Sequence, residues 1–332
     1  MSLNPFFTIA IPTFNRAGML KQALESLRDQ SFRNFEIIIG DNGSTDDTAT
    51  VVAEFSDLPI CYRRRLENLG PVANFNQLIQ EAKGEFFVLH WDDDFLHRDF
   101  LLRAYQVLNG RADRVAYATP HWHGRLGSGY VTDLQSSDSQ EISELTYFLR
   151  DEVIEISGER AAVKTLVSFP MVFPTTAVRL SALRESGGYF QEFEFGGDVV
   201  TMARVLSRGK VVYDARVGGY TRIHGGNSSL NQNKEWKKQC HRNKIQAIVD
   251  YFEKSKIDWK THLRAELRQM GEGRILMELK VLTGNRSHQE LISVIYQVLH
   301  EQAQRKGVRF LRKLISRIGL KNSIYLWKCI RR

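Results

Sequence analysis

The fold of this chain is decided by the stretch Phe86-Phe87-Val88-Leu89-His90-Trp91-Asp92-Asp93-Asp94-Phe95. It begins with mostly apolar residues, two of them aromatic and one β-branched, and such a run predicts a strand that is buried on both faces. Three carboxylates follow at once, and they would repel one another unless a cation joined them. Ligands of open α/β sheets bind outside the carboxyl ends of the strands, so we expect a binding site at the end of this strand.

An oxygen-rich cluster of this kind suits Mg²⁺ or Mn²⁺. From these residues alone, the alternative is a solvated acidic turn, because runs of acidic residues are common in loops. The rest of the sequence favours the binding site.

The composition indicates a folded protein in a reducing compartment. Of the 332 residues, 42% are hydrophobic and 11% are aromatic, which is ample for one large or two moderate domains. Cys61, Cys240 and Cys329 are widely spaced and are not combined with histidines at metal-ligand spacing, so neither a disulfide framework nor a zinc site is predicted. No apolar run is long enough to span a membrane and residues 1–7 do not resemble a signal peptide, so we expect a cytoplasmic protein.

The positive charge is concentrated at the end of the chain. The formal net charge is +8, and the residues after Glu301 include ten lysines and arginines and no acidic residue. The remainder is therefore slightly acidic. This asymmetry argues against a nucleic-acid-binding core and for a basic segment with a separate role.

Strands and helices alternate along the first two thirds of the chain. Short apolar runs predict strands at residues 6–11, 35–39, 60–63, 86–90, 115–119, 171–178 and 210–213. Amphipathic spacing predicts helices near residues 17–30, 51–55, 71–79, 181–186 and 198–206, and a helical pattern from about 231 to the end. The segments 121–157 and 220–228 are polar, and we expect loops there, the first of them meeting the acceptor. Three helix starts are predicted: a capping box of Ser44 and Asp47, Pro71 in a first turn, and Asp198 as a cap.

This alternation predicts a doubly wound, mostly parallel sheet with the loops that follow its strands on one edge. Residues 12–16, 41–45, 68–70 and 92–94 should therefore converge into one binding site. Neither a G-x-G-x-x-G nor a Walker A sequence follows the first strand, so a nucleotide must be held in another way.

Six motifs in the order found here resemble those of the family 2 glycosyltransferases, which have the GT-A fold. They are TIAIPTFNR, FEIIIGDNGSTDDT, ENLGPVANFNQLIQEAKGE, FFVLHWDDDF, GGYFQEFEFGGD and YTRIHGGNSS, and they extend from about residue 6 to 230. Each motif alone is weak, whereas the ordered set is specific. The resemblance implies a GT-A type α/β catalytic domain at 1–230, with a nucleotide-sugar half at about 1–120 and an acceptor half at about 121–230. Residues 231–332 then form a helical C-terminal region.

The resemblance also implies the residues of the donor site. The nucleotide would be bound by Pro12, Thr13, Phe14, Asn15, Asp41, Asn42, Asn68, Asp92 and Asp93. The family often has two acids where this chain has Asp41-Asn42, and this departure leaves the base open. The alternative for Asp41 is a turn residue that accepts a hydrogen bond from its own backbone.

By the same resemblance, Asp92, Asp94 and His224 would bind Mn²⁺ or Mg²⁺, which neutralises charge on the leaving nucleoside diphosphate. The family often has an acid where Trp91 stands, so the frame of this motif is uncertain by one residue. A histidine hydrogen-bonded within a glycine-rich loop is the alternative for His224.

Asp198 matches the catalytic base of the family, which removes the proton of the acceptor hydroxyl in an inverting attack. The family usually has an acid directly before this residue, where this chain has Gly197. A helix cap without a catalytic role is the alternative.

The C-terminal tail, 305–332, lies beyond the resemblance. Its apolar stripe beside basic residues predicts either peripheral contact with an anionic membrane, at its inner face, or packing on the catalytic domain or a second subunit. The oligomeric state is open.

The leading hypothesis is an inverting transferase that moves a sugar from a nucleotide diphosphate sugar to a glycan or lipid-linked acceptor, in cell-surface polysaccharide or lipid-linked glycan assembly. The alternative is a non-catalytic nucleotide- or glycan-binding module that keeps the fold, supported by Gly197 and Trp91. A nucleic-acid-binding protein rests on the pI of about 9.3 alone. A nucleotidyltransferase is disfavoured because no glycine-rich, lysine-bearing loop follows the first strand.

Overall fold

A mixed sheet forms the centre of the molecule. The computed structural model describes residues 4–124, 141–142, 153–167, 173–189, 196–222, 224, 234–270 and 289–306. Within these residues the sheet has eight strands in the order β3-β2-β1-β4-β10-β6-β11-β9. In chain order they are β1 (Phe7–Thr13), β2 (Phe35–Asp41), β3 (Ile60–Arg64), β4 (Phe86–Leu89), β6 (Arg114–Ala118), β9 (Val153–Ile156), β10 (Thr176–Arg179) and β11 (Lys210–Asp214).

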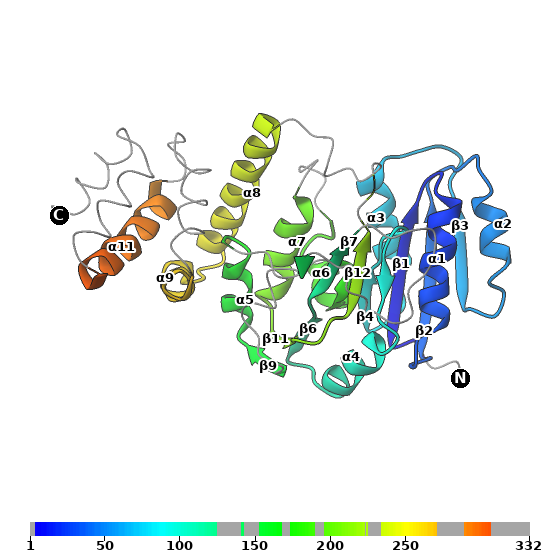
Figure 1. The fold of residues 1–332 in the computed structure, drawn as a ribbon, viewed down its shortest axis with the longest axis horizontal. Helices are drawn as coiled ribbons and strands as arrows, with labels where there is room; N and C mark the ends of the chain where they lie inside the picture. Colours follow the sequence, from blue (N-terminus) through cyan, green and yellow to red (C-terminus); the bar gives the residue numbers. More distant parts are fainter. Residues whose placement is uncertain are drawn as a thin grey trace.

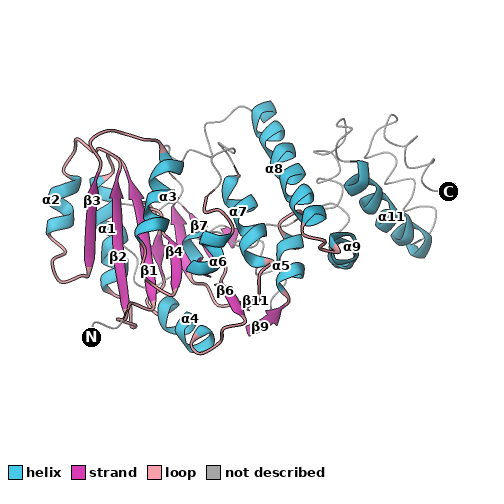
Figure 2. Cartoon of the chain, turned by 180° about the vertical axis from the view of Figure 1, so that it is seen from behind, coloured by secondary structure: helices cyan, strands magenta, loops and turns pink. Residues whose placement is uncertain are grey.

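Helices cover both faces of this sheet (Figures 1 and 2). One face packs against α1 (Ala17–Arg28), α2 (Thr48–Ala53) and α4 (Phe100–Leu108), and the other against α3 (Pro71–Glu81), α5 (Gly158–Lys164), α6 (Leu180–Glu185) and α7 (Gly197–Leu206). Each layer has its own buried apolar cluster. The architecture is the predicted α/β fold, a sheet flanked by helices.

Strand β4 lies between these two clusters. Phe86 and Val88 belong to one cluster, whereas Phe87 and Leu89 belong to the other, and all four side chains are fully buried. This alternation is what a central strand requires, because successive side chains of a strand point to opposite faces. The prediction of a strand buried on both faces is confirmed.

The sheet is mostly parallel, as predicted, with two exceptions. Strands β1, β2, β3 and β4 are parallel to one another, and so is the pair β6 and β11. Strand β10 runs antiparallel between β4 and β6, and β9 runs antiparallel at the edge beside β11. The carboxyl ends of β1, β2 and β4 therefore lie at one edge, where the loops were expected to converge.

A second, smaller sheet lies next to the acidic cluster. Within the described residues its order is β5-β12-β7-β8, with β5 (Phe95–Leu96), β7 (His121–Gly124), β8 (Glu141–Ile142) and β12 (Gly219–Arg222). The prediction of loops at 121–157 and 220–228 was wrong, because both segments contain strand residues. Gly219 and Tyr220 pair with Leu96 and Phe95, so β12 runs directly beside the chain that leaves the acids.

Three local predictions need correction and one is confirmed. Helix α2 begins after Asp47, and no capping box forms because the Ser44 hydroxyl accepts a bond from Asn15 instead. Helix α7 begins after Gly196, so Asp198 lies inside its first turn. Only the later part of the strand expected at 171–178 is described as one, at β10, after a short 3₁₀ turn. Pro71 does occupy the first turn of α3.

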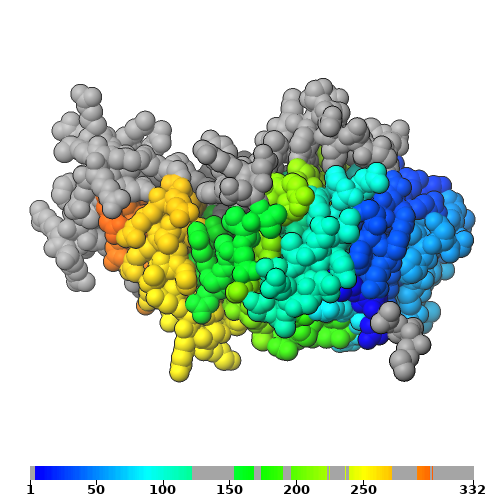
Figure 3. Space-filling view, turned by 90° about the horizontal axis from the view of Figure 1, so that it is seen from below, coloured from blue at the N-terminus to red at the C-terminus, as the bar shows by residue number. Residues whose placement is uncertain are grey.

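The C-terminal helices continue the core on the side of α5 and α7. They are α8 (Lys234–Lys254), α9 (Trp259–Gln269) and α11 (Gln289–Lys306), and their residues Ile245, Leu263 and Ile295 join the same buried cluster. Figure 3 shows these helices and the first strands at opposite ends of the molecule. In the part of the chain that the structure describes, no helix is long and apolar enough to cross a membrane. The predicted tail lies outside the described residues after Lys306.

Candidate functional site

The acidic cluster is held on one side by the loop that follows β1. The Thr13 hydroxyl donates a 2.7 Å hydrogen bond to Oδ2 of Asp92. The guanidinium of Arg16 lies 3.0 Å from Oδ1 of Asp92 and 3.2 Å from Oδ2 of Asp93. The predicted convergence of the loops after β1 and β4 is therefore present as direct contacts.

The small sheet holds the cluster from the other side. The backbone N–H of Arg222 donates to Oδ1 of Asp94 at 3.1 Å, and the Thr221 hydroxyl lies 3.4 Å from Oδ2. His224 places its Nε2 atom 3.0 Å from Oδ2 of Asp93. Strand β12 thus brings residues more than 120 positions later in the sequence against the acids.

Burial and mutual repulsion perturb these carboxyls. Burial raises the pKa of Asp92 to about 6, with a further increase from Asp93 and an opposing decrease from Arg16 and Thr13. The pKa of Asp94 is also raised well above its ordinary value, first by burial and then by Asp93. A divalent cation would relieve both effects, since an opposite charge favours the ionised form.

The donor atoms therefore fit a hard divalent cation. His224 contacts Asp93, and the carboxylates of Asp92 and Asp94 on either side of Asp93 in the sequence are buried with it. Carboxylate oxygens suit Mg²⁺ and Mn²⁺. Among the described residues no three His, Cys, Asp or Glu side chains already form a complete metal-ligand group. Asp93, which the sequence analysis placed with the nucleotide, is the carboxylate that contacts His224.

The loop after β2 builds a rigid wall beside the acids. Oδ1 of Asp41 accepts the Ser44 N–H at 2.8 Å, and its Oδ2 accepts the Tyr62 hydroxyl. Nδ2 of Asn42 donates to Oδ1 of Asn68 at 2.6 Å. The two loops are therefore joined, as expected from their strand ends. Asp41 makes the turn hydrogen bond that was its alternative interpretation, and Tyr62 adds a contact that the sequence did not reveal.

The residues between β1 and α1 present an aromatic ring to solvent. Phe14 is 41% exposed, whereas the neighbouring Thr13 is buried and Pro12 is half-buried. Asn15 has a positive φ of 52°, which costs energy for a residue other than glycine. Its N–H donates to Oγ of Ser44 at 2.9 Å, and this bond helps hold the conformation. An exposed ring on a fixed loop is a suitable surface for stacking a base.

Asp198 lies at the same edge of the sheet, at the start of α7. This helix ends just before β11 begins, so its first turn lies at the carboxyl ends of the parallel strands. Burial raises the pKa of Asp198, and the ammonium group of Lys244 on α8 opposes the increase. The methylene stem of Lys244 covers Gly196, where a Cβ atom would lie 2.9 Å from Cδ of the lysine.

Aromatic rings join Asp198 to the acidic cluster. Burial and then the charge of Asp198 raise the pKa of Tyr189. The Tyr189 ring packs against Phe75 at 5.0 Å between centroids, and Phe75 packs against Trp91 at 5.3 Å. Trp91 is therefore a packing residue, and the carboxylates of the motif begin at Asp92.

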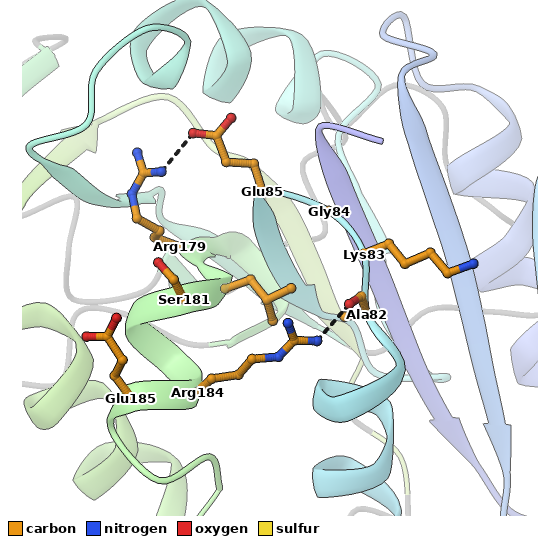
Figure 4. A pocket seen from close by; sticks show the side chains of 9 residues that line it. Ala82, Lys83, Gly84, Glu85, Arg179, Ser181, Arg184 and Glu185 are labelled. Atoms are coloured by element: carbon orange, nitrogen blue, oxygen red, sulfur yellow. Dashed lines mark hydrogen bonds and ion pairs between the residues drawn. The ribbon is translucent and has the colours of Figure 1, made fainter. Parts of the chain in front are cut away.

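A separate pocket of about 430 Å³ lies at the opposite edge of the sheet (Figure 4). It is lined by residues 82–85, which precede β4, by Arg179 at the end of β10 and by α6. Both of its arginines are engaged, Arg179 with Glu85 and Arg184 with the carbonyl of Ala82. This pocket is remote from the residues singled out by sequence.

Tyr62, Arg222 and Lys244 shape the site but were not predicted from the sequence, and Arg16 was predicted only as the end of the converging segment 12–16. Arg16 and Arg222 lie inside the motifs quoted above, so the motifs were the available signal. Lys244 lies on a helix without any motif, and nothing in the sequence distinguishes it.

The chain is similar to known glycosyltransferases. The sequence model described as Glycosyl transferase family 2 matches residues 8–160. An uncharacterized glycosyltransferase, RT0329 of Rickettsia typhi, is 27% identical over 240 residues, which is 70% of each chain. Abequosyltransferase RfbV of Salmonella typhimurium is 36% identical over 111 residues, 32% of this chain and 33% of that relative. A Campylobacter jejuni GalNAc(5)-diNAcBac-PP-undecaprenol beta-1,3-glucosyltransferase is 36% identical over 95 residues, 28% and 31% of the two chains.

Solved structures share the fold over almost the whole chain. S. aureus TarS 1-349 in complex with UDP-GlcNAc superposes with a TM-score of 0.56 at 16% identity, covering 91% of this chain and 92% of that one. Mannosyltransferase PcManGT from Pyrobaculum calidifontis, in complex with GDP-Man and Mn²⁺, superposes with a TM-score of 0.53 at 18% identity, covering 94% and 79%. At this identity the likeness is one of fold.

Proposed function

We propose that this chain is a member of glycosyl transferase family 2 and that it transfers a sugar from a nucleoside diphosphate sugar to a hydroxyl of a glycan or lipid-linked acceptor, with inversion. The observation that carries the proposal is the convergence of Thr13, Arg16 and His224 on the buried carboxylates Asp92 and Asp93. The packing of the sheet does not require three adjacent buried acids. Binding of a donor and its cation would explain them.

The donor lies along the carboxyl edge in this proposal. Phe14 offers a stacking surface for the base, and Asp41, Asn42 and Asn68 form the polar wall beside it. Pro12, Thr13 and Asn15 shape the connection to the acids. The relatives bind different nucleotides, UDP-GlcNAc in TarS and GDP-Man in PcManGT, so the base is to be found by experiment.

The cation, Mn²⁺ or Mg²⁺, is held by the Asp92–Asp94 cluster with His224. When bound, it neutralises charge on the diphosphate leaving group. The buried carboxyls with raised pKa values are the groups of this chain that gain most from such a charge. The Mn²⁺ in the PcManGT complex supports a divalent cation here.

Asp198 is the base. Its carboxylate removes the acceptor proton while the acceptor oxygen attacks the anomeric carbon, so a new C–O bond forms as the bond to the diphosphate breaks. The raised pKa suits this role, because a base is most effective when its pKa approaches the working pH. The aromatic group of Tyr189, Phe75 and Trp91 lies between the base and the acids and can pack against the sugar.

The acceptor and its location complete the proposal. The names of two relatives specify an undecaprenol-linked and a dolichyl-linked acceptor, which supports a lipid-linked glycan. We place the protein at the cytosolic face of a membrane, in peripheral contact through residues 305–332. Deletion of these residues should abolish co-sedimentation with anionic liposomes; unchanged co-sedimentation would contradict the contact.

The test is donor turnover. Wild-type protein with Mn²⁺ should release UDP or GDP from a matching nucleotide sugar, and acceptor extracts should accelerate the release. Asp198→Asn should bind the same donor with unchanged affinity and lose turnover about 10²-fold or more. Asp250→Asn, on the exposed part of α8, is the matched control. Binding without turnover by the wild type would favour the non-catalytic binding module.

A further inference from the structure

Arg16 occupies the position between two carboxylates where a cation is expected. A single nitrogen of its guanidinium lies 3.0 Å from Asp92 and 3.2 Å from Asp93. The same Oδ2 atom of Asp93 that Arg16 contacts is also the atom that faces His224. Oδ2 of Asp93 therefore contacts both Arg16 and His224, and His224 is a predicted ligand of the metal.

The backbone at Arg16 is fixed while its side chain has room to move. Asn15 donates its N–H to Ser44 and accepts from the N–H of Thr45, so the loop is tied to the next strand end. The Arg16 side chain is 33% exposed, whereas those of Asp92 and Asp93 are 5% and 10% exposed. The arginine can therefore leave the carboxylates by rotation of its side chain, without a change in the fold.

The charge of the site explains why the arginine is there. Three buried carboxylates would repel one another strongly without a compensating charge. Arg222 contributes from β12, where its guanidinium covers the Phe95 ring at 4.7 Å, and Arg16 contributes from the solvent side. Arg16 directly bridges Asp92 and Asp93.

We propose that Arg16 is a built-in counter-ion that the divalent cation displaces. The inference rests on the proposed function, because it takes the acidic cluster to be the cation site. Arginine and metal compete for Oδ2 of Asp93, and their like charges repel each other at this distance. The apo site is kept folded and compact by Arg16, and the cation alone binds weakly. A nucleoside diphosphate adds phosphate ligands to the cation and offers an anion to the displaced guanidinium.

The competition predicts a gain of metal affinity on loss of the arginine. Mn²⁺ binding is measured without nucleotide, by electron paramagnetic resonance of the free ion or by calorimetry, on wild type, Arg16→Gln and Arg28→Gln. Arg28 ends α1, the helix that Arg16 precedes, and pairs with Asp57 on the surface, so it controls for loss of an arginine as such. Arg16→Gln should bind Mn²⁺ about fivefold or more tightly than wild type, and Arg28→Gln should bind as wild type does. Unchanged or weaker binding by Arg16→Gln would overturn the proposal.

Stability supplies a second readout. Arg16→Gln should melt below wild type in chelator, and Mn²⁺ should raise its melting temperature more than it raises that of wild type. A variant that folds only with Mn²⁺ supports the proposal in the same way. Arg16→Lys keeps the charge and should bind Mn²⁺ with close to the wild-type affinity. This variant tests the proposal if Arg16→Gln does not fold. Tight Mn²⁺ binding by Arg16→Lys would contradict competition by charge.

Nucleotide binding by wild type separates the role of Arg16 from the proposed function. If wild type with Mn²⁺ binds no nucleoside diphosphate, the proposed function fails. If it binds one, and Arg16→Gln shows no gain in Mn²⁺ affinity, only the role of Arg16 fails.

Discussion

The hydroxyl of Thr13 donates to Oδ2 of Asp92 across the ends of β1 and β4, and this 2.7 Å bond is buried. This bond holds the Asp92 carboxylate, whose other oxygen, Oδ1, accepts a hydrogen bond from Arg16. One short side chain from the first loop therefore orients the acidic cluster.

Thr13→Val should remove this bond at nearly constant volume. A hydrogen bond to a charged group contributes roughly 1.5–3 kcal/mol, and we expect a loss in this range because Asp92, with a pKa of about 6, is mostly ionised at pH 7. Urea unfolding at pH 7 measures it. Thr176→Val is the control, since among the described residues the buried Thr176 hydroxyl has no hydrogen-bond partner. Equal stability of the two variants would contradict a role for the Thr13 bond.

Tyr62→Phe should weaken nucleotide binding. Without the Tyr62 hydroxyl, Asp41 keeps its bond from Ser44 but loses the donor on Oδ2, so the carboxylate is less firmly oriented. We expect nucleoside diphosphate affinity to fall about threefold to tenfold, the usual effect of one hydrogen bond. Calorimetric titration measures it, with Tyr105→Phe, on the Phe32 face of α4, as the control. Unchanged affinity would exclude Asp41 from the nucleotide site.

His90 should make the protein less stable in acid. It is fully buried, and burial lowers its pKa to about 4, whereas an unfolded histidine titrates near 6.5. As the pH falls from about 6.5 to about 4, the histidine takes up a proton in the unfolded state but not in the folded state. The free energy of unfolding therefore decreases by up to ~3 kcal/mol. His90→Gln does not show this loss of stability. Unfolding curves in chelator should therefore show the variant gaining on wild type as the pH falls, and parallel curves would refute the neutral buried histidine.

Lys244→Met should shift the pH dependence of transfer. The ammonium group lowers the pKa of Asp198, so its removal raises this pKa further. The base is then protonated at a higher pH, and the acidic limb of the rate profile moves upward, by about half a unit to one unit for a nearby charge. Lys260→Met, on α9, is the control. An acidic limb that stays at the same pH would show that Lys244 does not affect the pKa of the base.

The centre of the fold was predictable because it is local. The run Phe86–Leu89 has no polar residue, and a central strand with acids at its end is the natural consequence. The ends of β1 and β2 follow by the rule that parallel strands place their carboxyl ends on one edge. The converging loops and the joined Asn42 and Asn68 confirm this reasoning.

The opposite side of the site was not predictable, because it depends on pairing between distant segments. Gly219–Arg222 is four residues long and polar, so it resembles a loop, and it becomes a strand only by pairing with Phe95 and Leu96. The antiparallel β10 between β4 and β6 follows no local signal either. Ser44 matches a capping box, but tertiary contact with Asn15 uses its hydroxyl. Lys244 reaches Gly196 through helix packing alone.

The most direct test of the account is the binding of UDP and GDP with Mn²⁺ or with chelator, measured by calorimetry on wild type, Asp93→Asn and Asp113→Asn. Asp113 pairs with Lys210 at the opposite edge and serves as the control. The account predicts that one nucleoside diphosphate binds to wild type and to Asp113→Asn only with Mn²⁺, and that Asp93→Asn weakens this binding about tenfold or more. Absence of binding by folded wild type, or binding that neither chelator nor Asp93→Asn affects, would contradict it.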